Sequence, residues 1–100
     1  MLAGLMCGIA TFYGIGDGFH GNLTANGERF NAYALTAAHP YLPMGTRLRV
    51  TNQRNLKQVI VRVNDRGPYS HADIDLSYAA FAHIAPTRKG NAVVCWRVVG

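Results

Sequence analysis

Hydrophobic and polar residues alternate most strictly in two segments near the middle of the chain. In TRLRVTN (46–52) the apolar residues occupy every second position, and in QVIVRVND (58–65) three valines do the same. Such alternation is typical of strands that bury one face. Because the intervening residues QRNLK fit a connecting turn, the two segments are predicted to pair as a β-hairpin.

Shorter patterns predict the other elements. IATFYG (9–14) and NAVVCWRVV (91–99) are rich in β-branched and aromatic residues and are expected to be strands. SYAAFAHIA (77–85) is predicted to be a short helix with Ser77 as its N-cap. YALTAAH (33–39) fits either a helix or a strand. Several short strands with one brief helix predict a mainly β protein built as a small β-barrel.

The composition indicates one small globular domain. The chain has 100 residues, of which 49% are hydrophobic and 15% charged, and this balance is typical of a folded rather than a disordered protein. No apolar run approaches the length of about eighteen residues that a membrane-spanning helix needs. The sequence therefore predicts no membrane span.

Two cysteines, Cys7 and Cys95, lie near opposite ends of the chain. A disulfide between them would close a loop of almost the whole chain and stabilise it by about 4 to 5 kcal/mol. Two buried free thiols are the alternative. We favour the disulfide because a small domain gains most from such a link. The wide separation of the two residues excludes a CxxC redox or zinc pair.

The chain is basic, with a formal net charge of +5. Eight of its ten cationic residues are arginine, and the planar guanidinium group suits carboxylate or phosphate better than the lysine ammonium does. This charge is compatible with a nucleic acid, an anionic glycan or a membrane surface, and it does not select among them.

Three of the five carboxylates are close together in sequence. Asp65, Asp73 and Asp75 lie within eleven residues, where the second predicted strand gives way to a turn. If that strand includes Asp65, its side chain falls on the valine face, where partial burial favours the protonated carboxyl group. An Asx-type turn at NDRGP is the alternative for Asp65.

The other acidic residues and the histidines carry weaker signals. Asp75 also fits a role at the start of the predicted helix, and Glu28, just after an Asn-Gly turn, fits a solvated charge. The four histidines show no HxH or HExxH spacing, so we expect no metal site. His39 ends an apolar stretch at a turn, where it fits a polar site residue. Tyr13, Phe19 and Tyr69 lie beside loops, where exposed aromatic rings can stack on sugar faces.

The order of several motifs resembles a known family. ATFYG, FHGNLTANGERFN, LTAAHPYLPMGTRLRVTN, VIVRVNDRGPY and IDLSYAAFA follow one another as in the catalytic domain of the rare lipoprotein A family. The resemblance covers residues 8–99. It implies a small six-stranded double-psi β-barrel with one or two short helices, a fold shared with expansins and barwin-like proteins. We expect this catalytic domain at 8–100, after an N-terminal extension at 1–7.

The resemblance also implies a function. Members of this family are bacterial lytic transglycosylases, which cut peptidoglycan strands between N-acetylmuramic acid and N-acetylglucosamine and leave 1,6-anhydro ends. The implied substrate is glycan stripped of its stem peptides, and the reaction needs no cofactor. The implied protein is a monomer in the bacterial cell envelope, periplasmic or secreted, with peptidoglycan rather than nucleic acid as its partner.

The resemblance assigns candidate site residues. Glu28 in GERF and Asp65 in VNDRGP match the essential carboxylates of the family, and His39 in TAAHP matches a third functional position. Our hypothesis is that Asp65 acts first as the acid and then as the base, while Glu28 orients the sugar or stabilises positive charge and His39 forms a hydrogen bond in the cleft. In the alternative, Asp65 and Glu28 exchange these roles. The expected substrate-binding residues are Asp75, Tyr13, Phe19, Asn64, Arg66 and Tyr69.

Two other functions compete with this hypothesis. One is a non-catalytic, expansin-like module that binds cell-wall glycan. The presence of both Glu28 and Asp65 argues against it, because binding alone requires neither. The other is a nucleic-acid-binding protein, which only the net charge suggests, since RLRV and VRVND offer little interleaving of basic and aromatic residues.

Overall fold

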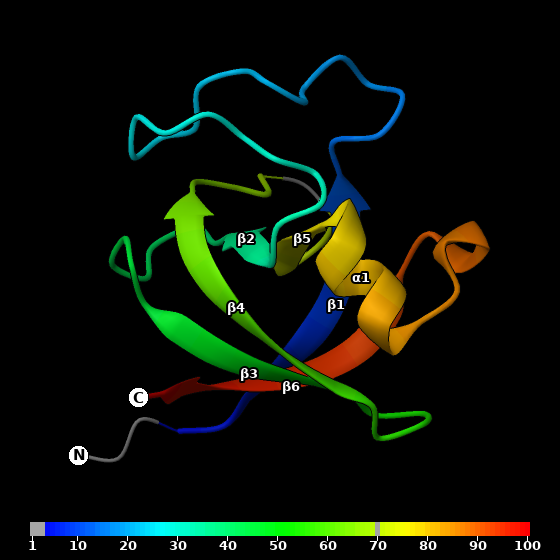
Figure 1. Ribbon diagram of the computed structural model, residues 1–100. Helices are drawn as coiled ribbons and strands as arrows, with labels where there is room; N and C mark the ends of the chain where they lie inside the picture. Colours follow the sequence, from blue (N-terminus) through cyan, green and yellow to red (C-terminus); the bar gives the residue numbers. More distant parts are fainter. Residues whose placement is uncertain (1–3, 70) are drawn as a thin grey trace.

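The computed structural model describes residues 4–69 and 71–100 as one barrel with a helix packed against it (Figure 1). Residues 1–3 of the expected extension lie outside the described part. The elements are β1 (Met6–Tyr13), β2 (Thr36–Ala38), β3 (Arg47–Asn52), β4 (Gln58–Asp65), β5 (Ile74–Ser77), α1 (Tyr78–Ile84), the 3-10 helix η1 (Thr87–Lys89) and β6 (Ala92–Val99). The first strand thus begins at Met6, two residues before the expected domain boundary.

The six described strands form a closed barrel in the order β1-β5-β2-β4-β3-β6. Strand β1 is parallel to β5 and β2 is parallel to β4, while the other neighbouring strands are antiparallel. The predicted hairpin is confirmed as β3 and β4, with Val50 opposite Val59. These features confirm the expected small, six-stranded double-psi β-barrel.

Segment 33–39, which fits a helix or a strand by sequence, contains β2. Residues Thr36–Ala38 are buried and lie between β4 and β5. Their backbone groups pair with two strands at once, and this pairing decides the conformation where local propensity does not.

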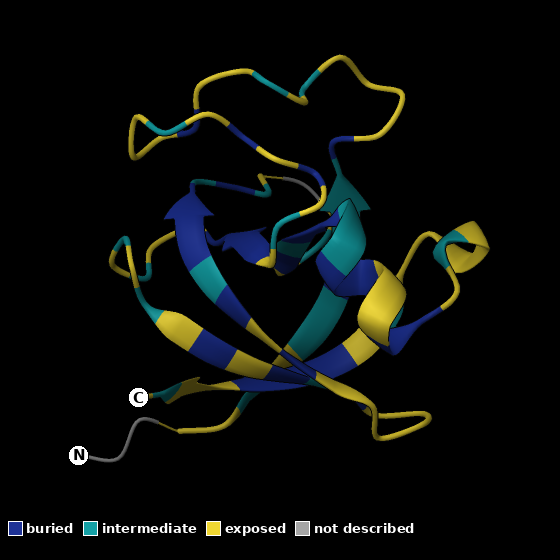
Figure 2. Cartoon of the chain, in the orientation of Figure 1, coloured by how far each residue is buried: buried dark blue, intermediate teal, exposed yellow. Residues whose placement is uncertain are grey.

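The core lies inside the barrel and is formed by alternate residues of the strands. Along β3 and along β4 as far as Val63, buried positions alternate with more exposed ones (Figure 2), and Leu48, Val61 and Val63 are at most 1% exposed. Helix α1 adds Phe81 to this core, and the side chain of Ser77 accepts a hydrogen bond from the Ala80 N–H, as predicted for an N-cap. No helix among the described residues is long and apolar enough to cross a membrane.

A long irregular segment, residues 14–35, connects β1 to β2 and lies over one end of the barrel (Figure 1). It is held by an aromatic cluster in which the Tyr13 ring stacks on Phe30 at 4.4 Å and Phe19 packs edge-on against both. Gly14 has a φ of 106°, and a Cβ at this position would collide with the Phe30 ring. Glycine is therefore required where the chain leaves β1.

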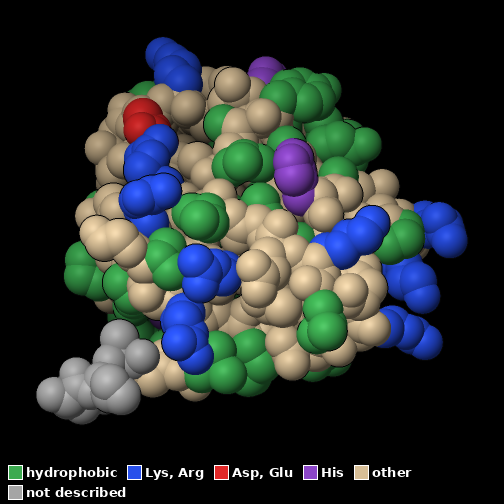
Figure 3. All heavy atoms as spheres, turned by 60° about the horizontal axis from the view of Figure 1, so that its bottom comes forward, with side chains coloured by type: hydrophobic (Ala, Val, Ile, Leu, Met, Phe, Trp, Pro, Cys, Tyr) green, Lys and Arg blue, Asp and Glu red, His purple; other side chains and the backbone are tan. Residues whose placement is uncertain are grey.

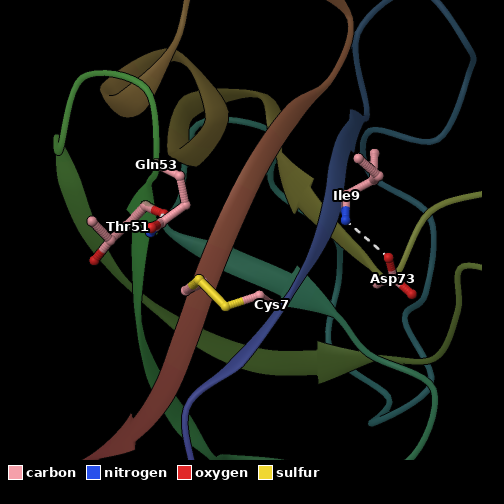
Figure 4. Close-up of a disulfide and its surroundings, with 6 residues drawn as sticks. Cys7, Ile9, Thr51, Gln53 and Asp73 are labelled. Atoms are coloured by element: carbon pink, nitrogen blue, oxygen red, sulfur yellow. Dashed lines mark hydrogen bonds between the residues drawn. A yellow bond between two sulfur atoms is a disulfide. The ribbon is translucent and has the colours of Figure 1, made fainter.

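The predicted disulfide between Cys7 and Cys95 is present. The two cysteines lie directly opposite each other on the antiparallel strands β1 and β6 (Figure 4). The disulfide thereby joins the first and last strands where the barrel closes.

Candidate active site

A β-bulge near the end of β4 determines where Asp65 points. Ala37 of β2 lies opposite Val63, but Ala38 lies opposite Asp65, so the register shifts by one residue at Asn64. Strict alternation would place Asp65 with the valines on the core face. The bulge instead places Asp65 on the outer face, and this corrects the expectation from the sequence pattern.

Asp65 belongs to a row of residues that crosses four adjacent strands on the outer face. Ala38 lies between Asp65 on one side and Asp75 of β5 on the other, and Thr11 of β1 is the neighbour of Asp75. Side chains at paired positions point to the same face of a sheet. Because Ala38 contributes only a methyl group, the two carboxyl groups face the same space. We call these four residues the carboxylate row.

The Asp65 carboxylate is held by three donors. Its Oδ2 accepts a hydrogen bond from the Tyr13 hydroxyl at 3.1 Å, and its Oδ1 accepts from the backbone N–H groups of Ala25 and Arg66, each at 2.9 Å. Burial and the negative charge of Asp65 raise the pKa of Tyr13, so the phenol stays protonated and donates. Asp65, only 8% exposed, therefore has a defined orientation.

The pKa of Asp75 is higher than that of an ordinary surface carboxylate. Burial raises its pKa to about 6, and the negative charges of Asp17 and Asp65 add to this effect, while a 3.0 Å hydrogen bond from the Thr11 hydroxyl opposes it. The start of α1 is capped by Ser77, so Asp75 is not needed there. It is a carboxyl group that can hold a proton near neutral pH.

Glu28 reaches the same region from the segment 14–35. Its Oε1 accepts hydrogen bonds from Arg62 Nη2 at 2.8 Å and from Asn64 Nδ2 at 2.6 Å, both of β4. These bonds lower the pKa of Glu28, and the bond from Arg62 has the largest effect. Glu28 is therefore an ionised group, and it ties the segment 14–35 to β4.

His39 follows β2 and is 1% exposed. Its ring Nδ1 accepts hydrogen bonds from the backbone N–H groups of Tyr41 and Leu42, both at 3.2 Å, and the backbone N–H of His39 donates to the Asp65 carbonyl oxygen at 3.1 Å. Burial and the charge of Arg66 lower the pKa of His39, so its ring is neutral. His39 thus shapes the turn beside Asp65 and is joined to it through the backbone.

The expected substrate-binding residues differ in what they contact. Asn64 holds Glu28, while Arg66 Nη1 donates to the carbonyl oxygens of His39 and Leu42. The guanidinium group of Arg66 is therefore occupied within the protein. Tyr69, in contrast, is 83% exposed and suits stacking on a sugar.

Asp73 lies apart from the carboxylate row. Its Oδ2 accepts a hydrogen bond from the Ile9 N–H at 2.9 Å (Figure 4), and its side chain covers Gly8, where a Cβ would collide with it. This contact joins the start of β5 to β1, so Asp73 has a structural role.

The sequence-based reasoning missed two site residues. Thr11 alternates with the core-facing Phe12 in the pattern ATFYG, so the face it shares with Tyr13 could have been identified. Arg62 alternates with the buried valines of β4, but this pattern does not indicate what its side chain contacts. Its partner, Glu28, is 34 residues away in the chain, and no local pattern joins the two.

Comparisons with known proteins identify relatives of this chain. A family profile described as lytic transglycolase matches residues 5–96. The chain is 55% identical over 94 residues to a probable endolytic peptidoglycan transglycosylase RlpA of Nostoc sp., covering 93% of this chain and 25% of that protein. It is 62% identical over 93 residues to the protein of the same name from Synechocystis sp., and the match covers 92% of this chain and 28% of that protein. The chain thus spans about a quarter of these relatives.

Solved structures share the fold. The Streptomyces papain inhibitor superposes with a TM-score of 0.77 at 27% identity and covers 97% of this chain and 96% of its own. An expansin of Clavibacter michiganensis superposes with a TM-score of 0.76 at 23% identity, and the match covers 96% of this chain and 50% of the expansin. Because proteins with such different names share this barrel, function follows from the site rather than the fold. The family profile covers nearly the whole chain and the high identities extend as far, and on both grounds the chain belongs to the lytic transglycolase family.

Proposed function

We propose that this domain is a lytic transglycosylase that cuts peptidoglycan between N-acetylmuramic acid and N-acetylglucosamine. The observation that carries the proposal is the carboxylate row, where Asp75, with a pKa of about 6, and the firmly held Asp65 face one space. A carboxyl group that can hold a proton, beside a second one that hydrogen bonds keep in a fixed orientation, can supply an acid and a proton acceptor at a glycosidic bond.

The reaction requires one proton to be given and another to be taken. A protonated carboxyl group donates to the glycosidic oxygen as the bond from C1 of the muramic acid breaks, and positive charge develops at C1. The C6 hydroxyl of the same sugar then bonds to C1, and its proton passes to a base. No water is consumed, so neither carboxylate has to activate a water molecule as hydrolysis requires.

The surroundings of each carboxyl group favour a division of these roles. Asp75 keeps its proton up to about pH 6 and is the proposed donor, whereas the sequence-based hypothesis gave that step to Asp65. Asp65 has a free acceptor position besides its three donors and would take the proton from the C6 hydroxyl. Glu28, ionised and partly exposed, would stabilise the positive charge at C1.

The charge of the chain supports an anionic glycan as substrate. Strands stripped of stem peptides keep the lactyl carboxylates of their muramic acids, which the net charge of +5 complements. Such a substrate places the protein in the bacterial cell envelope, either in the periplasm or outside the cell.

The test is mass spectrometry of the soluble products formed from peptide-free peptidoglycan. The unaltered chain should release anhydro-muramyl fragments, and Asp65→Asn and Asp75→Asn should each release almost none. Asp73→Asn, which alters an acid that lies apart from the carboxylate row, is the matched control and should remain active. Full activity of Asp75→Asn would refute its role as the donor. Binding of glycan without any fragments would favour the expansin-like module instead.

The pH dependence gives a second test of the donor. Because Asp75 must be protonated to act, kcat/KM of the unaltered chain should fall as the pH rises through about 6. A rate that is constant from pH 5 to pH 8, approximately the range in which this group titrates, would contradict the assignment.

A further inference from the structure

Four arginines form a continuous strip on the outer face of three neighbouring strands. Arg47 of β3 lies opposite Arg62 of β4, and Arg49 of β3 lies opposite Arg97 of β6. Figure 3 shows basic side chains following one another along this side of the molecule, with an acidic group near one end. We call Arg62, Arg47, Arg49 and Arg97 the arginine strip.

This arrangement is unfavourable for the isolated domain. Like charges directly opposite each other on neighbouring strands destabilise a sheet. Strands β3 and β6 contain no Asp or Glu, and among the described residues the ion pair found in the strip joins Arg62 to Glu28. Arg47, Arg49 and Arg97 are exposed without an acidic neighbour on their own strands. Their clustering therefore suits an anion from outside the chain.

A hollow of about 250 Å³ adjoins the far end of the strip. Arg49 and Arg97 line it together with the polar side chains of Thr51, Gln53 and Gln58. Thr51 and Gln53 lie beside the disulfide in Figure 4. A guanidinium group binds a carboxylate through paired hydrogen bonds, while amide and hydroxyl groups suit the hydroxyls of a sugar. The hollow therefore matches a carbohydrate that carries carboxylates.

We propose that the arginine strip and this hollow form a second, non-catalytic binding surface for a carboxylate-bearing glycan strand. This inference rests on the proposed function, because the same strand would extend to the carboxylate row. The two regions are continuous: Arg62, the first member of the strip, holds Glu28 of the site. A strand bound along the strip is thereby kept at the site between successive cuts.

The test is co-sedimentation with insoluble peptide-free peptidoglycan at low and high salt. The double variant Arg49→Gln/Arg97→Gln should bind about tenfold more weakly, because two charge-assisted contacts are lost, and its binding should depend less on salt. The matched control is Arg54→Gln/Lys89→Gln, which removes the same charge from a separate hollow and should bind like the unaltered chain. Equal losses in both variants would show that only net charge matters and would overturn the proposal.

Further measurements separate this proposal from its competitors. Thermal unfolding at low salt should show an equal or higher Tm for Arg49→Gln/Arg97→Gln, because repulsion is removed, and this excludes misfolding as the cause of weaker binding. A larger loss of binding to phosphatidylglycerol vesicles or to duplex DNA than to glycan would overturn the choice of partner. If the unaltered chain forms no anhydro fragments but Arg49→Gln/Arg97→Gln still loses glycan binding, the proposed activity is refuted and the second binding surface is supported. If fragments form and Arg49→Gln/Arg97→Gln binds normally, only the second binding surface is refuted.

Discussion

Replacing Asp75 by asparagine should make the protein more stable at neutral pH while it removes the proposed proton donor. Burial raises the pKa of Asp75 from 3.8 to about 6. A shift of about two pKa units corresponds to about 3 kcal/mol of differential interaction between the two protonation states. Asparagine keeps the shape of the side chain and its acceptor for the Thr11 hydroxyl, but it has no charge to bury.

The direction of the effect follows from proton binding. Below about pH 4 the Asp75 carboxyl group is protonated in both folded and unfolded chains, so its contribution to stability is fully present. Between about pH 4 and 6 the folded chain holds a proton that the unfolded chain has released, so stability falls as the pH rises. Above this range the free energy of unfolding has fallen by the full amount of about 3 kcal/mol. Asp75→Asn avoids this loss because asparagine does not ionise.

Urea unfolding of both proteins across this pH range measures the effect. The stability of Asp75→Asn relative to the unaltered chain should increase by about 3 kcal/mol between about pH 4 and 8. Asp17→Asn is a control of opposite sign, because hydrogen bonds from the Gly14 and Phe19 N–H groups lower the pKa of Asp17. That variant should lose stability at neutral pH, and the loss should vanish as the pH falls. A pH-independent difference for Asp75→Asn would refute both the raised pKa and the donor role.

Three other substitutions test the structure and the site. Replacing Cys7 and Cys95 by serine opens a loop with a sequence separation of 88 and should lower the free energy of unfolding by about 4 to 5 kcal/mol, as measured by thermal unfolding with and without reductant. Ser77→Ala removes a buried hydroxyl that donates to the Ala34 carbonyl and caps α1, so urea unfolding should show a loss of about 1–3 kcal/mol. Tyr13→Phe keeps the aromatic stacking but removes a donor to Asp65; kcat on peptide-free glycan should fall about tenfold, and an unchanged kcat would show that this bond does not orient the carboxylate.

Local patterns were sufficient for those elements whose structure depends on near neighbours. The alternation in 46–52 and 58–65 predicted the hairpin, because one face of each strand is buried. Ser77 predicted the start of α1, since capping involves only residues three positions away. Segment 33–39 stayed ambiguous because the strand within it forms only by pairing with β4 and β5.

The features of the candidate site can likewise be divided into those that follow from the sequence and those that depend on contacts between distant residues. The sequence by itself determined that this is a small basic barrel domain with carboxylates clustered near the end of a strand. Periodicity and motifs can be recognised from the order of residues along the chain, without knowledge of which strands pair. Only the tertiary structure decided that a bulge places Asp65 beside Ala38 and Asp75, and that Glu28 is paired with Arg62. Strand register and burial arise from contacts between residues far apart in the chain, and these contacts set both the direction of each carboxyl group and its pKa.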